Sequence, residues 1–148
     1  KGSPHLVVVS KIPLRDAKGR VIGVAGVSRR IEQLRSAPDS AKRLAAAINH
    51  LHQNSSEPLS TELLAQMAGM SVSQFERVFR KTLGTSPRQY LLQVRITKAA
   101  RLIAETDSSI ALIALECGFY DHAHFTRVFR QQTGRTPVAH RKRSRGKI

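Results

Sequence analysis

The sequence predicts a mainly α-helical protein: two helix-turn-helix subdomains joined by one long helix, about seven helices in all, after a short N-terminal β-hairpin. Helix-capping residues and glycines alternate after residue 38. A valine-rich stretch with a turn signal precedes them. Two stretches of thirteen residues also resemble each other, with seven identical residues in register. They are FERVFRKTLGTSP (Phe75–Pro87) and FTRVFRQQTGRTP (Phe125–Pro137). We interpret these stretches as two copies of one structural unit.

The composition limits the class of partner. The 148 residues carry a formal net charge of +15, which favours nucleic acid first and a membrane surface second. The lone cysteine, Cys117, leaves no disulfide within the chain, which fits a reducing compartment, and we expect the cytoplasm. No apolar run approaches the roughly 20 residues that a bilayer requires. Because the first residue is Lys1 and not Met, we expect a piece of a longer protein.

Residues 1–30 predict a hairpin. The stretches HLVVVSKIPL (His5–Leu14) and VIGVAGVS (Val21–Ser28) are rich in β-branched residues, and RDAKGR between them supplies a turn. A two-stranded ribbon is marginal in water, so these strands should belong to a larger sheet. Residues 31–38 are interpreted as a linker that ends at Pro38.

The helical part is predicted over residues 39–140, followed by a frayed basic tail at 141–148. Asp39 should cap the first helix, whose inward face carries Leu44, Ile48 and Leu51. The later starts are expected at Ser60, Ser71, Ser86-Pro87, Ser108 or Ser109, Asp121 and Thr136-Pro137, the last opening only a short turn. The stops are expected at Gly69, Gly84, about Thr106, Gly118 and Gly134.

Each copy of the repeat is a helix, a tight turn and a second helix. Ala65 lies four residues before Gly69, and Ala114 lies four before Gly118. A small residue lets the two helices approach closely, and the glycine can adopt the positive φ of the turn. This is the helix-turn-helix pattern, written twice.

The second helix of each copy should be amphipathic. On a wheel of about 100° per residue, one face of the first copy is apolar and predicted to point inward. It consists of Phe75, Val78, Phe79 and Leu83, and its counterpart consists of Phe125, Val128 and Phe129. The predicted outward faces consist of Ser73, Gln74, Arg77, Arg80 and Lys81, and of Ala123, His124, Arg127, Arg130 and Gln131.

These dimensions suit duplex DNA. An α-helix fits the major groove, where arginine bonds guanine bidentately and glutamine bonds adenine. The twenty residues from Pro87 to Thr106 would span about 30 Å as a helix, and successive major grooves on one side of DNA lie about 34 Å apart. One chain could therefore hold two reader helices in adjacent grooves, with its long helix anchored by Leu91, Val94, Ala99, Leu102 and Ile103.

At this point the residues resemble a known family. The stretch ALECGFYDHAHFTRVFRQQTGRTP (Ala114–Pro137), with ARLI at Ala100–Ile103, is similar to the signature of AraC/XylS-type transcription regulators, over roughly residues 40–143. The resemblance implies two helix-turn-helix subdomains that bind double-stranded promoter DNA. It places Ser73, Gln74, Glu76 and Arg77 in the first reader and His122, Ala123, Thr126 and Arg127 in the second. Ala123 departs from the polar residue that many members carry, although its methyl group can still touch a thymine methyl.

The full set of predicted DNA-binding residues extends these positions by caps and neighbouring cations. It comprises Ser71, Ser73, Gln74, Glu76, Arg77, Arg80, Lys81, His122, Ala123, His124, Thr126, Arg127 and Arg130. Arg80, Lys81 and Arg130 are expected at phosphates more than at bases. Glu76 either orients Arg80 or accepts a bond from a cytosine amine. The basic tail either adds phosphate contacts or is solvated.

A second resemblance concerns the N-terminus. KIPLRDAKGRVIGVAGVSRRI (Lys11–Ile31) is similar to the closing hairpin and exit of PAS sensor domains. About 30 residues are too few for a whole sensor, so any ligand pocket must lie mostly outside this chain. Further partners that this reading allows are RNA polymerase and, in the full-length protein, a second copy.

Other function classes find little support. The pairs His50–His52 and His122–His124 place their rings about 200° apart on a helix, which makes poor metal sites. Cys117 is interpreted as a small packed residue beside a turn, more than as a reactive thiol. We find no nucleophilic cluster, metal-ligand set or phosphate loop, and predict no enzyme and no cofactor. The predicted function is a bacterial sequence-specific transcription regulator, with activation or repression left open. The alternative is a basic architectural or interaction module that binds phosphates, or a protein partner, without reading sequence.

Overall fold

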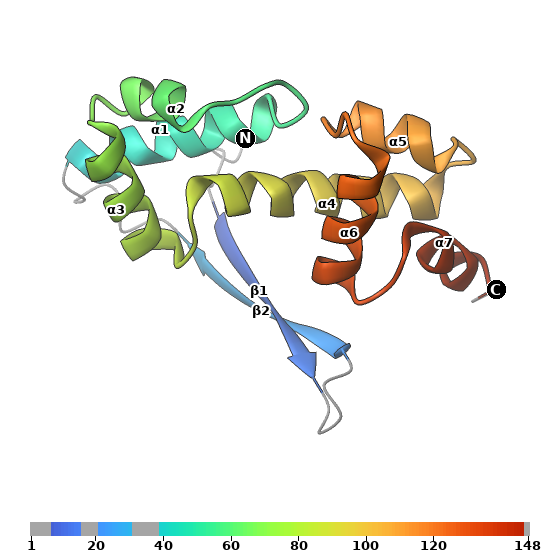
Figure 1. Ribbon diagram of the computed structural model, residues 1–148. Helices are drawn as coiled ribbons and strands as arrows, with labels where there is room; N and C mark the ends of the chain where they lie inside the picture. Colours follow the sequence, from blue (N-terminus) through green and yellow to red (C-terminus); the bar gives the residue numbers. More distant parts are fainter. Residues whose placement is uncertain (1–6, 16–20, 31–38, 147–148) are drawn as a thin grey trace, which may run out of the picture.

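The computed structural model describes residues 7–15, 21–30 and 39–146. Within these ranges the chain forms one antiparallel hairpin and seven helices (Figure 1). The predicted mainly α class, with two helix-turn-helix lobes on one long helix, is confirmed.

The hairpin consists of β1 (Val7–Arg15) and β2 (Val21–Arg30). Val7 pairs with Arg30 and Ile12 with Ala25, and the register shifts once between Leu14 and Arg15. β2 runs two residues further than the predicted strand, which was expected to end at Ser28. The predicted turn centre at 16–20 and the linker at 31–38 lie outside the described residues, and the likeness to a PAS domain stays a prediction.

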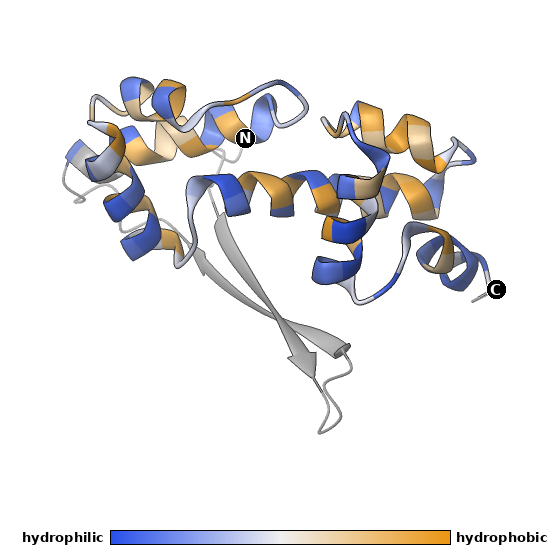
Figure 2. Ribbon diagram, viewed as in Figure 1, coloured by the Kyte–Doolittle hydropathy of each residue, from blue (hydrophilic) through white to orange (hydrophobic). Residues whose placement is uncertain are grey.

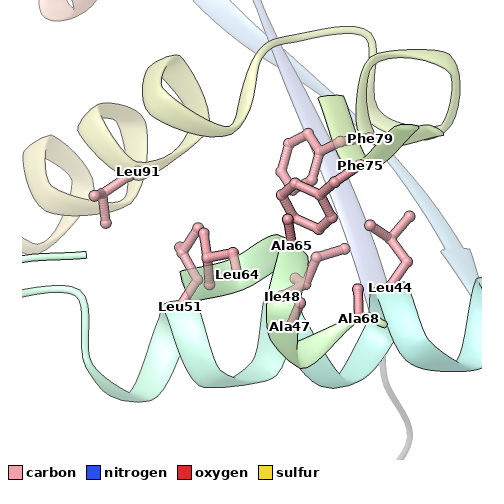
Figure 3. Close-up of a cluster of buried hydrophobic side chains, with 10 residues drawn as sticks. All are labelled: Leu44, Ala47, Ile48, Leu51, Leu64, Ala65, Ala68, Phe75, Phe79 and Leu91. Atoms are coloured by element: carbon pink, nitrogen blue, oxygen red, sulfur yellow. The ribbon is translucent and has the colours of Figure 1, made fainter. Parts of the chain in front are cut away.

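The first lobe contains α1 (Asp39–Gln53), α2 (Thr61–Met67) and α3 (Val72–Leu83). Asp39, predicted to precede the first helix, is its first residue. Figure 3 shows the side chains that these helices bury together, with Phe75 and Phe79 pointing from α3 toward Ala65. The buried cluster consists of Leu44, Ala47, Ile48, Leu51, Leu64, Ala65, Ala68, Phe75, Phe79 and Leu91.

The second lobe contains α5 (Ile110–Glu116), α6 (His122–Thr133) and α7 (Pro137–Arg145). Its separate core consists of Ile96, Ala99, Ile103, Ile113, Ala114, Cys117, Phe119, Phe125, Val128 and Phe129. Ala65 and Ala114, which occupy equivalent places in the repeat, are 1% and 2% exposed. The glycines four residues later have φ of +64° and +89°, as the turn requires.

The long helix α4 (Pro87–Glu105) belongs to both lobes. Ser86 caps it by accepting a hydrogen bond from the Gln89 amide, and Pro87 occupies its first turn. Leu91 lies in the first core, whereas Ile96, Ala99 and Ile103 lie in the second. Its 19 residues span about 28 Å at the rise of an α-helix. The predicted anchors Val94 and Leu102 are partly buried against the two cores.

The C-terminal end differs from the prediction. α7 is a nine-residue helix that extends to Arg145, so the expectation of a short turn and a frayed tail is wrong for residues 141–145. The physical reason is a set of contacts with the end of α4 and with the residues that follow it. Arg141 donates to the carbonyls of Ile103 (3.3 Å) and Ser108 (2.6 Å), and Arg145 pairs with Asp107. These bonds fix residues whose sequence alone reads as a solvated basic run.

Candidate nucleic-acid interface

α3 is oriented by its cap and by two phenylalanines. The Ser71 hydroxyl accepts a hydrogen bond from the Gln74 amide at 3.2 Å, which starts the helix. Phe75 and Phe79 are fully buried with ring centroids 5.6 Å apart, and Phe79 also meets Tyr90 of α4 edge-on at 5.5 Å. Because these rings fix one face of α3 inside the lobe, the opposite face must point to solvent.

The outward face of α3 is polar and cationic. All six predicted reader and phosphate residues on the helix are exposed, namely Ser73, Gln74, Glu76, Arg77, Arg80 and Lys81. Among the described residues Glu76 forms no ion pair with Arg80, so the first of the two predicted roles for Glu76 is not seen. Its other predicted role, as an acceptor from cytosine, stays a prediction.

α6 is built in the same way with a different cap. One carboxylate oxygen of Asp121 accepts hydrogen bonds from the amides of Ala123 (2.8 Å) and His124 (3.3 Å). Phe125 and Phe129 are fully buried, again with centroids 5.6 Å apart. Figure 2 shows the same alternation of hydrophilic and hydrophobic residues on α3 and α6. The repeat in the sequence is thus a repeat in structure.

Five predicted second-reader residues gather around one open hollow. They are His122, Ala123, Thr126, Arg127 and Arg130, and Gln131 and Thr136 complete its lining. Thr136 was missing from the predicted site. Its hydroxyl accepts from the Ala139 amide at 3.2 Å and begins α7, which brings it beside the end of α6. The Gly-x-Thr-Pro signal that predicted this cap could have placed it near the site.

His124 is the exception among the predicted residues. Its ring is half-buried and lies 5.7 Å from the ring of Phe119, in a different hollow that faces the first lobe. His124 therefore lies at the side of α6 and not fully outward, and its predicted contact with DNA stays a prediction. The reason is helical geometry: His124 lies four residues before Val128, and residues four apart share a helix face.

The two reader helices sit in different lobes but on one shared helix. Figure 1 shows α3 and α6 running in similar directions, one in each lobe, while α2 lies above α1 and α5 lies above the end of α4. Five exposed cations project from the two helices, namely Arg77, Arg80, Lys81, Arg127 and Arg130. Such a surface attracts a polyanion with a regularly spaced backbone.

Cys117 and the histidine pairs are the remaining candidates for chemistry. Cys117 is fully buried, and burial raises the pKa of its thiol, which opposes formation of a reactive thiolate. In the part of the chain that the structure describes, no three His, Cys, Asp or Glu side chains are grouped as a metal site would need. Across the same residues, no helix is both long and apolar enough to cross a bilayer.

Comparison with known proteins agrees with this architecture. A family model described as a helix-turn-helix domain matches residues 64–143. The chain is 36% identical over 107 residues to the HTH-type transcriptional regulator ArgR of Pseudomonas aeruginosa, a match that covers 72% of this chain and 32% of the relative. It is 33% identical over 96 residues to the HTH-type transcriptional activator RhaS of Escherichia fergusonii, covering 62% of this chain and 34% of the relative.

Solved structures show the same likeness. An AraC-type DNA-binding domain-containing regulator from Chromobacterium violaceum aligns with a TM-score of 0.66 at 37% identity, covering 71% of this chain and 94% of that one. The DNA-binding domain of AdpA, solved in complex with a target DNA, aligns with a TM-score of 0.63 at 35% identity, covering 74% and 96%.

The chain therefore matches nearly the full length of the solved DNA-binding domains, but only part of the longer curated regulators. The chain spans about a third of the length of the curated relatives that it matches. The family model covers more than half of the 148 residues, and it includes all of the second helix-turn-helix unit and most of the first. The chain belongs to the family of AraC-type helix-turn-helix DNA-binding domains of transcription regulators.

Proposed function

We propose that the chain binds double-stranded promoter DNA in a sequence-specific manner, with α3 and α6 entering adjacent major grooves. The observation that carries this proposal is the matched orientation of the two helices. Each buries a phenylalanine pair against its lobe and exposes a polar, cationic face, and both lobes are built on α4. The family is one of transcription regulators and not of enzymes.

Roles within the site follow from position and chemistry. Arg77 and Arg127 occupy equivalent places in the repeat, and we assign them to guanine. Arg80, Lys81 and Arg130 lie one turn further along and are assigned to phosphates. The hollow beside Ala123 leaves its methyl group open to a thymine methyl. The similarity to the AdpA domain, which was solved with a target DNA, supports DNA as the partner.

We also propose how the DNA-binding domain is connected to the rest of the regulator and which partners it has. A PAS-type sensor would precede the DNA-binding domain, and residues 31–38 would connect the two. RNA polymerase and, in the full-length protein, a second copy are proposed partners, and the cytoplasm is the proposed location.

Selection from a random DNA pool tests the proposal. We expect enrichment of one bipartite motif whose two half-sites lie about one helical turn, roughly 10 base pairs, apart. A set of retained sequences with no shared motif would contradict sequence reading. It would favour the alternative of a basic architectural module, which the net charge of +15 alone would permit. A matched selection with a double variant, Arg77→Ala with Arg127→Ala, should lose the motif.

A further inference from the structure

The two lobes touch each other above α4. The loop between α1 and α2 belongs to the first lobe, and the turn between α5 and α6 belongs to the second. A Cβ atom built on Gly118 of that turn would lie 2.9 Å from the carbonyl oxygen of Ser56. It would also lie 3.0 Å from the Cζ and Nε atoms of Arg95. Only glycine fits at this contact, where its φ is +89°.

Arg95 of α4 occupies the junction. Its Nε donates to the carbonyl of Ser55 at 2.6 Å, and a terminal nitrogen donates to the carbonyl of Glu57 at 2.9 Å. Its guanidinium carbon lies 6.0 Å from the ring centroid of Phe119, in the core of the second lobe. One side chain thus holds the backbone of one lobe and lies over an aromatic ring of the other.

Lys98 reinforces the same junction one turn along α4. Its Nζ donates to the Ser56 hydroxyl at 2.8 Å, so two cations engage three consecutive loop residues, Ser55, Ser56 and Glu57. We call the set of Arg95, Lys98, residues 55–57 and Gly118 the interlobe bridge. Figure 1 shows the α1–α2 loop extending above α4 toward the second lobe.

The bridge has a mechanical consequence because the two hydrophobic cores are separate. Leu91 lies in the first cluster and Ile96 in the second, and Arg95 lies between them on α4. Without the bridge, the lobes would be joined mainly through α4, and a single connection restrains their relative orientation less than two connections do. A planar guanidinium that fixes two carbonyls at once restrains direction as well as distance.

We propose that Arg95 is a positioning residue for DNA recognition, which through the interlobe bridge holds α3 and α6 in one relative orientation. This inference rests on the proposed function, because orientation matters only if both helices read the same duplex. A preset orientation reduces the ordering that binding of the second lobe requires, and so raises its effective concentration at the second groove.

The first test does not involve DNA. Spin labels are placed in the 148-residue chain at Lys81→Cys on α3 and Gln131→Cys on α6, equivalent positions of the repeat; the buried Cys117 should not label. Distance distributions are then measured by double electron–electron resonance. We expect Arg95→Ala to broaden the distribution, whereas Arg101→Ala, which removes an exposed arginine of the same helix, should leave it unchanged. Equal widths in the two variants would overturn the proposal.

Two further variants keep the test decisive if Arg95→Ala fails to fold. Arg95→Lys keeps the charge but cannot bond both carbonyls in the same fork, so it should broaden the distribution to a smaller degree. Lys98→Met removes only the bond to Ser56, and this variant should also broaden the distance distribution. Circular dichroism establishes folding of each variant, and unchanged distributions in both of these would equally reject the bridge.

The second test separates this inference from the proposed function. On the selected bipartite DNA, Arg95→Ala should lose roughly tenfold in affinity and tolerate altered half-site spacing, while binding to an isolated half-site stays the same. If the wild-type chain enriches no bipartite motif, the proposed function fails while the resonance experiment still judges the bridge. Wild-type affinity and spacing preference in Arg95→Ala would show that the bridge does not position the readers.

Discussion

Four phenylalanines of the repeat hold the two reader helices in their lobes. Phe75, Phe79, Phe125 and Phe129 are all fully buried, each pair with its centroids at 5.6 Å. In the second lobe, Phe129 also meets the ring of His140 edge-on at 5.5 Å. These contacts tie the reader helix to α7 as well as to the core, so they determine which residues of α6 remain outside.

Truncation of one of these rings should be costly. We expect Phe129→Ala to lower the free energy of unfolding by about 3–5 kcal/mol, because it removes apolar contacts and leaves a cavity. Urea denaturation followed by circular dichroism measures the change. Val138→Ala, at a side chain that is 56% exposed, is the matched control and should change stability by no more than about 0.5 kcal/mol. Similar losses in both variants would contradict the assignment of Phe129 to the core.

The two equivalent arginines carry the prediction about base reading. Arg77→Ala and Arg127→Ala should each weaken binding to the selected DNA by about 1–3 kcal/mol. The loss on scrambled DNA of the same length should be smaller, because phosphate contacts remain. Competition titrations with both duplexes measure the difference. An equal loss on both duplexes would assign these arginines to phosphates and remove them from base recognition.

At the scale of elements, side-chain caps determine where the helices begin. Ser60, Ser71, Ser86, Ser109 and Thr136 each accept a hydrogen bond from the amide three residues on, and Asp121 accepts two. The two readers end at Gly84 and Gly134, with φ of +73° and +78°. Each cap and each terminal glycine acts within a few residues of the helix end. The repeated sequence therefore produces the same reader helix twice.

The joint between α7 and α4 gives a prediction at this scale. Arg141 satisfies the carbonyl of Ile103 in α4 and that of Ser108 just after it, so Arg141→Ala should lower the free energy of unfolding by about 1–3 kcal/mol, as expected when carbonyls lose a charged donor. Arg143→Ala, at an exposed position of the same helix, is the control and should leave stability almost unchanged. If Arg141→Ala reduced only DNA affinity, a phosphate-binding tail would describe these residues better.

At the scale of the whole molecule, charge should dominate affinity. A net charge of +15 predicts that the logarithm of the binding constant falls linearly with the logarithm of salt concentration, by about 0.9 per phosphate neutralised. Removing one phosphate contact through Arg130→Ala should reduce that slope by about 1. Fluorescence anisotropy over a salt series measures both slopes. An unchanged slope would show that Arg130 does not contact a phosphate.

Stability should decrease in mild acid. Burial lowers the pKa of His52, which lies 2.7 Å from the Tyr90 hydroxyl, and of His140, which packs on Phe129. The unfolded chain, with an ordinary histidine pKa of 6.5, then binds protons more readily than the folded chain. The contribution of the two histidines to the free energy of unfolding is therefore complete above pH 6.5. It is lost as the pH falls through 6.5 toward the lower pKa of the folded state.

Thermal unfolding at about pH 7.5 and about pH 5.5 measures this linkage. The melting temperature should fall toward the lower pH, and His140→Gln should show a smaller fall than the wild type. His122→Gln, at an exposed position of α6, serves as the control. A fall of the same size in His140→Gln and in the wild type would mean that His140 makes no contribution to the pH dependence.

Much of this molecule follows from local sequence. Caps, turn glycines and the spacing of apolar residues predicted the six later helix starts, the extent of α4 and the buried phenylalanine pairs. They did so because each signal acts over one or two helical turns. The outward position of Arg77 and Arg127 follows from the same periodicity. The hairpin strands were predicted by their β-branched residues, whereas the likeness of this segment to a PAS domain remains a prediction.

Other features depend on residues that are far apart in the chain. The helical residues 141–145 need the carbonyls of Ile103 and Ser108, which lie more than 30 residues earlier. The interlobe bridge joins Arg95 to a loop 40 residues earlier. Sequence by itself determined where the helices begin and which face of α3 and of α6 carries the buried phenylalanines, because those features depend on hydrogen bonds and periodicity within a segment. Only tertiary packing decided how the two lobes are joined, since the interlobe bridge brings together segments that lie far apart in the sequence.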